Sequence, residues 1–125
     1  MEQAKIARLK AYVPYSKFKV GASILFNDGE YVTGCNIENV SYGLTICAER
    51  VALFNMVLKG YEARDVVEMN IIADTEDVCY PCGACRQVMV ELLNPDTVIN
   101  LGNLKGDIKS FRLSDLMPNA FEVLK

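Results

Sequence analysis

The chain has 125 residues, of which 51% are hydrophobic, and it carries a formal net charge of −3. This length predicts a single domain over residues 1–125, because a domain typically needs about 100–150 residues to enclose a core. Its basic residues are scattered, so the chain lacks the Lys and Arg patch that binds phosphate backbones or anionic lipids. We therefore expect neither a nucleic acid nor a membrane as a partner.

The N-terminal part of the sequence predicts a helix followed by a hairpin. Residues 2–11 favour a helix, and residues 18–26 begin with the alternation of a strand. Asn27-Asp28-Gly29 is a turn signal, after which residues 30–38 predict the returning strand. Residues 39–46 have no periodic pattern and predict an irregular loop.

The remaining sequence alternates between helix and strand. The apolar spacing of residues 47–59 predicts a helix, and residues 66–73 predict a buried strand rich in Val and Ile. A second helix is expected over 83–93, followed by short strands near 97–101 and 108–113. This order predicts an α/β fold in three α/β/α layers, with a single mixed five-stranded sheet between the helices.

Cysteine and histidine content restricts the possible chemistry. The N-terminal segment MEQAKIARLKAYV is charged and lacks the apolar core of a signal peptide, so we expect a cytoplasmic protein. In that reducing compartment, five cysteines favour metal binding or catalysis over disulfides. The chain has no histidine, so a metal site must use sulfur or oxygen, and any general base must be another residue type.

Three of the cysteines are spaced as metal ligands. Cys82 and Cys85 lie three residues apart at the start of a predicted helix, which puts both thiols on one face. Cys47 stands at the start of the other helix and would be the third ligand. Three protein ligands leave one position of a tetrahedral Zn²⁺ ion open for water, the arrangement of a catalytic site.

Charged residues beside these thiols predict how such a site would work. Glu49 follows Cys47 by two residues, so both side chains reach one bound group only if a helix begins near Cys47. Glu49 would then accept a proton from the water. Three thiolates outweigh the charge of Zn²⁺, and we expect Arg50 and Arg86 to donate to the sulfurs and so restore the acidity of the metal.

Two other interpretations of the cysteines stay open from the residues alone. A Cys-x-x-Cys pair also occurs in thioredoxin-like redox proteins and in structural zinc sites. A non-catalytic module of either kind would need a fourth ligand, such as Cys79, or a disulfide between Cys82 and Cys85. Cys35 falls within a predicted strand, where a small core residue is the simpler interpretation.

At these motifs the chain resembles the small homotetrameric cytidine deaminases. The segments CAER and PCGACRQV carry the likeness, and PYSKFKVGA, GCNIENVSYGLTICAER and LMPNAF extend it over nearly the whole chain. The signature belongs to the wider zinc deaminase class. The resemblance implies hydrolytic deamination of cytidine and deoxycytidine, with one Zn²⁺ on Cys47, Cys82 and Cys85 and with Glu49 as the proton shuttle. A deaminase of aminoglycosyl-nucleoside antibiotics is the alternative within the family.

The resemblance also implies the substrate contacts. Asn36 and Glu38 would hold the ribose hydroxyls, and Phe18 and Phe121 would enclose the pyrimidine ring. Tyr42 and Phe121 would come from neighbouring subunits of a homotetramer. The backbone carbonyls of Ala48 and Cys82 are the candidates to hold the amino group of the substrate.

Overall fold

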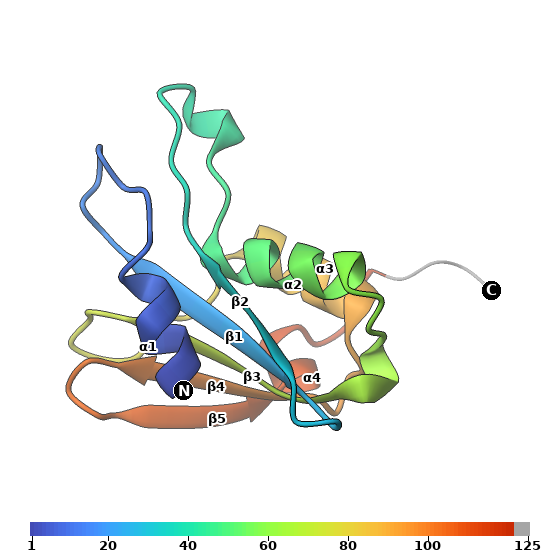
Figure 1. Cartoon of the computed structure of the whole chain (residues 1–125). Coiled ribbons are helices and arrows are strands. Elements are labelled where there is room, and N and C mark those ends of the chain that lie inside the picture. Colours follow the sequence, from blue (N-terminus) through green and yellow to red (C-terminus); the bar gives the residue numbers. More distant parts are fainter. Residues whose placement is uncertain (122–125) are drawn as a thin grey trace.

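The computed structural model describes residues 1–121 and consists of one mixed sheet between helices (Figure 1). The strand order is β2-β1-β3-β4-β5, in which only β3 and β4 run parallel. The elements in chain order are α1 (Glu2–Arg8), β1 (Val20–Phe26), β2 (Tyr31–Cys35), η1 (Tyr42–Leu44), α2 (Ala48–Leu58), η2 (Ala63–Asp65), β3 (Val66–Ala73), α3 (Gly83–Leu92), β4 (Val98–Asn103), β5 (Ile108–Arg112) and α4 (Leu113–Leu116). This architecture confirms the predicted fold class.

Two glycines show that the helices cover opposite faces of the sheet. A Cβ on Gly21 would lie 2.0 Å from the carbonyl oxygen of Ala4 in α1, and a Cβ on Gly34 would lie 2.4 Å from the nitrogen of Ala52 in α2. Gly34 pairs with Ala22, the neighbour of Gly21, and successive residues of a strand face opposite sides. Glycine therefore lets α1 approach one face of the sheet and α2 approach the other.

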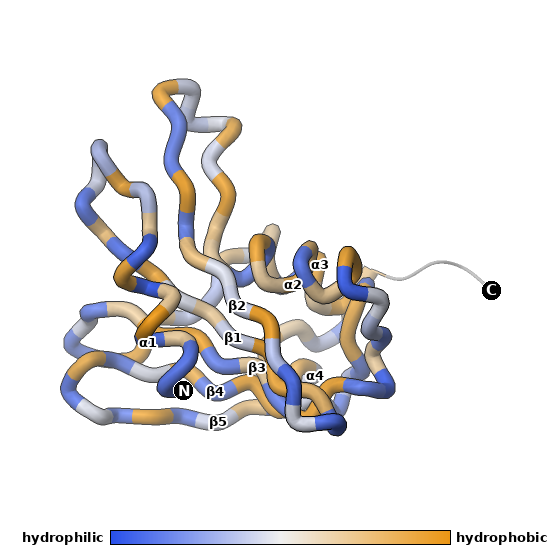
Figure 2. Tube along the Cα trace, in the orientation of Figure 1, coloured by the Kyte–Doolittle hydropathy of each residue, from blue (hydrophilic) through white to orange (hydrophobic). Residues whose placement is uncertain are grey.

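The core lies between the sheet and the pair α2 and α3. Its fully buried members come from all three elements and include Ile24, Leu53, Met56, Met69, Met89 and Ile99. On its outer side α2 also exposes the apolar side chains of Phe54, Val57 and Leu58. Apolar positions recur along the trace of the molecule in Figure 2. No helix within residues 1–121 is long and apolar enough to cross a membrane.

Strands β1 and β2 are shorter than the sequence predicts, because side-chain hydrogen bonds replace the backbone hydrogen bonds between strands at their ends. The Asn36 side chain accepts a hydrogen bond from the Val20 N–H at 2.9 Å and donates to the Phe18 carbonyl at 2.7 Å. The Arg8 side chain donates to the Lys19 carbonyl at 3.2 Å. The chain beyond these points forms two long loops, 12–19 and 36–46, which stand above the sheet in Figure 1.

Three short helices were not predicted. The expected irregular loop 39–46 contains the single turn η1, η2 directly precedes β3, and α4 follows β5 directly. Elements of three or four residues are too short to show a helical period, so their sequences carry no signal. The long elements lie close to their predicted bounds.

Candidate metal centre and active site

Three thiols converge from the starts of two helices. Cys47 is the N-cap residue of α2 and Cys82 is the N-cap residue of α3, and both have extended backbones (ψ 154° and 166°) just before the helix begins. Cys85 lies in the first turn of α3 and is buried. The helices lie on the same face of the sheet, so their starts bring all three sulfurs together.

The spacing of the sulfurs fits a tetrahedral ion. The three Sγ atoms lie within 4.8 Å of one another, and those of Cys47 and Cys82 are 3.9 Å apart. Zinc–sulfur bonds of about 2.3 Å in tetrahedral geometry require sulfurs roughly 3.8 Å apart. Within residues 1–121 this is the one cluster of three or more Cys, Asp or Glu ligands, and Cys79 is not part of it.

The charge around the thiols favours a thiolate at Cys47. The Arg50 guanidinium donates from Nη2 to the Cys47 sulfur at 3.5 Å. Hydrogen bonds from the Cys85 thiol and from Arg50 lower the pKa of Cys47 to about 5. The same contact with Cys47, together with burial, raises the pKa of Cys85. Cys47, beside the Arg50 guanidinium, is therefore the first of the three thiols to lose its proton.

Glu49 is a buried carboxyl beside this cluster. It lies in the first turn of α2 and is 5% exposed, although glutamate is rarely buried without a partner. Burial, and then the charge on Cys47, raise the pKa of Glu49 to about 7. A carboxyl with a pKa near neutrality can both accept and release a proton at physiological pH, as a general acid–base catalyst must.

The position of Arg86 differs from the expectation that it donates to the thiolates. Its Nε donates to the Pro81 carbonyl and its Nη1 to the Leu116 carbonyl, both at 2.7 Å. The side chain folds back along α3 because helical side chains incline toward the N-terminus. Arg50 alone of the two arginines contacts a cysteine sulfur within the described residues.

The Ala48 carbonyl is not available to a substrate, which corrects a second expectation. Ala48 is fully buried, and its oxygen would lie 2.5 Å from a Cβ on Gly34, so it points toward β2. The Cys82 carbonyl accepts the Arg86 N–H within α3. Ala48 is instead the first residue of α2, and its N–H is one of those that find no partner inside a helix. If Ala48 contacts a substrate, it therefore does so through its backbone N–H.

Asn36 and Glu38 both bind the 12–19 loop. Oε1 of Glu38 accepts the N–H groups of Tyr15 at 3.0 Å and Ser16 at 3.1 Å. The Ser16 hydroxyl, and after it these two N–H groups, lower the pKa of the carboxyl. Asn36 bonds to Phe18 and Val20, on either side of Lys19, as described above. The two predicted ribose-binding residues thus hold the loop that carries Phe18.

The predicted aromatic contacts are exposed in the single chain. Phe18 is 39% exposed, Tyr42 72% and Phe121 81%. Tyr42 packs edge-on against Tyr15 with ring centroids 6.1 Å apart, and the Phe121 carbonyl accepts a hydrogen bond from Gln87 of α3.

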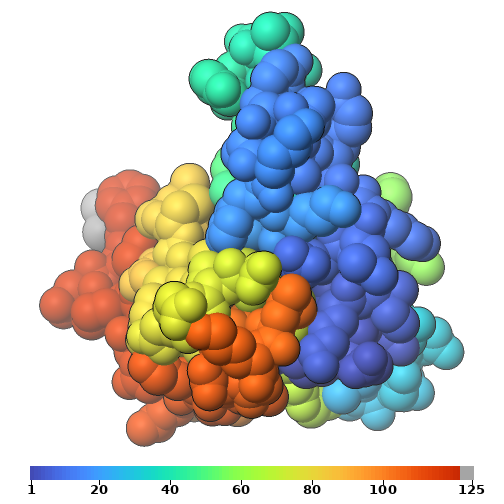
Figure 3. Space-filling model, turned by 90° about the vertical axis from the view of Figure 1, so that its left-hand side faces the viewer, coloured from blue at the N-terminus to red at the C-terminus, as the bar shows by residue number. Residues whose placement is uncertain are grey.

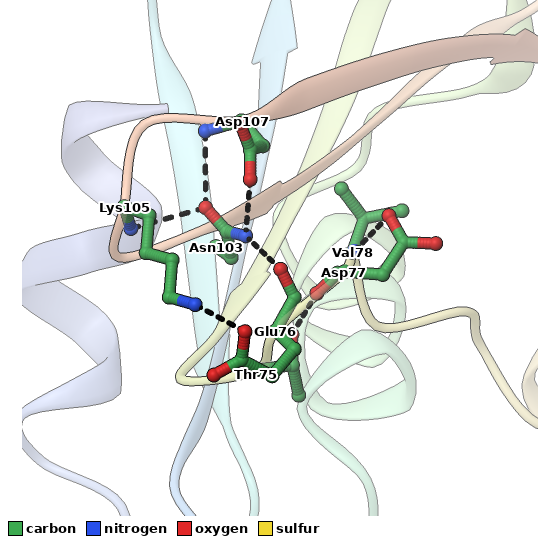
Figure 4. Close-up of polar contacts among 7 residues, drawn as sticks. All are labelled: Thr75, Glu76, Asp77, Val78, Asn103, Lys105 and Asp107. Atoms are coloured by element: carbon green, nitrogen blue, oxygen red, sulfur yellow. Dashed lines mark hydrogen bonds and ion pairs between the residues drawn. The ribbon is translucent and has the colours of Figure 1, made fainter.

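A polar network that the sequence did not predict fixes the loop before α3. The buried amide of Asn103 donates to the Glu76 carbonyl at 3.0 Å and to Asp107 at 2.9 Å, and it accepts the N–H groups of Lys105 and Asp107 (Figure 4). Every hydrogen-bonding position of this amide is filled. The β4–β5 turn and the 74–80 loop are neighbours on the surface in Figure 3, so Asn103 anchors the segment that leads to Cys82.

Comparison with known proteins agrees with this arrangement. Residues 1–101 match the family model of the cytidine and deoxycytidylate deaminase zinc-binding region. The chain belongs to the cytidine and deoxycytidylate deaminase family. It is 54% identical to the cytidine deaminase of Halalkalibacterium halodurans, over 97% of this chain and 90% of that one, and 50% identical to that of Sporosarcina psychrophila, over 95% and 86%.

A solved structure shares the fold closely. The crystal structure of cytidine deaminase from Burkholderia pseudomallei superposes with a TM-score of 0.93 at 49% identity, over 96% of this chain and 94% of that one. The family is defined by its zinc-binding region, and the cluster of three thiols supplies a donor set that suits this ion. The cofactor is therefore Zn²⁺, with one ion per chain.

Proposed function

We propose that the protein catalyses hydrolytic deamination of cytidine and 2'-deoxycytidine to uridine and 2'-deoxyuridine, with release of ammonia. The observation that carries this proposal is the buried carboxyl of Glu49 beside three convergent thiols. The similar proteins of Halalkalibacterium and Sporosarcina are cytidine deaminases by name. We further propose that the enzyme works in pyrimidine salvage in the cytoplasm.

In the proposed mechanism, Cys47, Cys82 and Cys85 would hold the zinc ion, which would supply the Lewis-acid chemistry that lowers the pKa of water. Glu49 takes the proton of this water and delivers it to ring N3, which makes C4 of the pyrimidine electrophilic. After the water oxygen bonds to C4, Glu49 takes the remaining proton of that oxygen and delivers it to the amine. The C4–N bond then breaks, ammonia leaves, and the C4 carbonyl of uridine forms. Arg50 lowers the negative charge of the thiolates, and the Ala48 N–H is a donor for a pyrimidine oxygen.

An ultraviolet assay tests the function directly. The long-wavelength ultraviolet absorbance of cytidine and deoxycytidine should fall as the amino group is replaced, and a chelator should stop the reaction. Adenosine should remain unchanged. Faster conversion of an aminoglycosyl-nucleoside antibiotic than of cytidine would move the function to that substrate class, and the absence of any conversion would overturn the proposal.

Glu38 provides a specific prediction about the ribose. One oxygen of its carboxylate already holds the 12–19 loop, which leaves Oε2 to accept from a ribose hydroxyl. Glu38→Gln should keep the loop but lose this acceptor, and KM for cytidine should rise about tenfold, the cost of roughly one hydrogen bond, with kcat little changed. The variant and the wild type should differ less on 2',3'-dideoxycytidine. An equal rise in KM on both substrates would contradict the role.

We also propose that four copies of the chain assemble. Apolar side chains of α2 and of the 36–46 loop are exposed, among them Val40, Leu44, Phe54, Val57 and Leu58. A hollow of about 540 Å³ lies on the outer side of α2 and α3, where Phe54, Val57, Val88 and Leu92 line it. Neighbouring copies that cover these surfaces can bring Tyr42 and Phe121 to each other's substrate sites.

The assembly has a simple test. Light scattering should give a mass about four times the 13.9 kDa of one chain. Phe54→Lys places a charge in the hollow on α2 and α3 and should yield smaller species with little activity. Tyr31→Lys is the matched control, since Tyr31 is a similarly exposed aromatic on β2. A wild-type protein that is monomeric and fully active would contradict the proposal.

A further inference from the structure

Arg86 joins two segments that are distant in sequence. Its Nε holds the carbonyl of Pro81, the residue directly before the metal-site residue Cys82. Its Nη1 holds the carbonyl of Leu116, the last residue of α4. Residues 117–121, which we call the C-terminal segment, begin at this point and end at Phe121. One guanidinium therefore bridges the turn that presents a thiol and the segment that presents an aromatic ring.

Neither carbonyl has a helical partner of its own. Pro81 precedes the N-cap of α3, and Leu116 is at the C-terminal end of α4, where carbonyl groups lack intrahelical donors. Arginine suits this position because its planar group presents several donors in fixed directions, whereas lysine presents a single nitrogen. Hydrogen bonds from a charged donor are also stronger than neutral ones.

The bridge holds the backbone directly before Cys82. The Cys82 sulfur accepts the Cys85 N–H at 3.4 Å and lies 3.9 Å from the Cys47 sulfur, so its position follows from the backbone of the Pro81–Cys82 turn. Gln87, the next residue of α3, bonds to the Phe121 carbonyl at 3.2 Å. Consecutive residues of α3 thus hold the two ends of the C-terminal segment against the helix that carries two of the thiols.

We propose that Arg86 is a positioning residue that couples the metal site to the C-terminal segment. A bound zinc ion fixes the Pro81–Cys82 turn, and through Arg86 it favours the docked position of residues 117–121. Coupling of this kind is reciprocal, so docking of the segment also slows the loss of zinc. The meaning of this coupling for catalysis rests on the proposed function, whereas the coupling itself does not.

Release of zinc tests the bridge without any substrate. Arg86→Lys keeps the charge but cannot span both carbonyls, and Arg86→Met removes both contacts. Both variants should release zinc to a chromogenic chelator about 10- to 100-fold faster than the wild type, the usual cost of losing a group that supports metal ligands. Arg64→Lys is the matched control, because Arg64 is an exposed arginine on η2 that pairs with Glu62. Its release rate should equal that of the wild type.

A core variant distinguishes a specific effect on zinc release from a general loss of stability. Ile99→Val removes one buried methylene on β4, and it should lower the melting temperature without changing the rate of zinc release. Amide hydrogen exchange then measures the coupling. Residues 113–121 should exchange more slowly with zinc than without it in the wild type, and this difference should disappear in Arg86→Lys.

Two results would overturn the proposal. One is a zinc-release rate in both Arg86 variants within twofold of the wild-type rate. The other is exchange of residues 113–121 that does not depend on zinc in the wild type. If the protein failed to deaminate cytidine while both measurements came out as expected, the proposed function would fail and the coupling would stand.

Discussion

Replacing Glu49 by glutamine should leave the zinc content and the fold unchanged while turnover falls by two to four orders of magnitude, the range for loss of a general acid–base catalyst. The side chain is almost fully buried beside the thiols, and glutamine has nearly the same volume, so the surrounding packing is preserved. The amide can neither take the proton of water nor deliver it to the substrate. Glu49→Ala should have the same effect on turnover.

The measurement is kcat on cytidine together with zinc analysis of the same preparation. Glu30→Gln serves as the control, since Glu30 is an exposed carboxylate at the β1–β2 turn. Because the proton transfers follow binding, KM for cytidine should change much less than kcat. A Glu49→Gln variant with full zinc and more than about a tenth of wild-type turnover would end the assignment of Glu49, because a catalytic acid–base group is worth far more than that.

The sequence predicted the centre of this site better than its surroundings. Helix starts have local signals, and the prediction that α2 begins at Cys47 and α3 near Cys82 agrees with the structure. The direction of a side chain or carbonyl depends on tertiary packing. For this reason the expected targets of Arg86 and of the Ala48 carbonyl were wrong, since Leu116 and Gly34 approach them from elsewhere in the chain.

Asn103 illustrates a second limit of sequence analysis. In the sequence it is one polar residue at the end of a predicted strand, and such residues are common in turns. Only the fold shows that its amide is buried and bonded to the 74–80 loop. A residue that acts by closing a network between distant segments has no local pattern, so spacing alone could not identify it.

The charge balance of the site explains why Arg50 and the helix starts belong with the thiols. Three thiolates exceed the charge of Zn²⁺ and would make a bound water less acidic. The guanidinium of Arg50 at the Cys47 sulfur and the Cys85 N–H at the Cys82 sulfur both withdraw this negative charge. The negative charge of Cys47 also adds to the effect of burial in raising the pKa of Glu49.

Removal of zinc should abolish activity and destabilise the protein. Dialysis against a chelator should reduce turnover to background, and one equivalent of Zn²⁺ per chain should restore it. A ligand that binds only the folded state stabilises it by about 4 kcal/mol when present at 1,000 times its Kd, so the melting temperature should fall on removal. Cys85→Ser should behave like the zinc-free protein, whereas Cys35→Ser, a lone cysteine of β2, should retain zinc and activity.

Cys79 distinguishes a catalytic zinc site from a structural one. It is half-buried near the site, where burial and the charges of Glu49 and Cys47 raise the pKa of its thiol, but it lies outside the cluster of three sulfurs. A catalytic site needs an open fourth position, so Cys79→Ser should keep one zinc per chain and most of the turnover. Loss of zinc from Cys79→Ser as complete as that from Cys85→Ser would mean four thiolate ligands. With no position left for water, the cluster would then be a structural centre, and the deaminase mechanism would have to be abandoned.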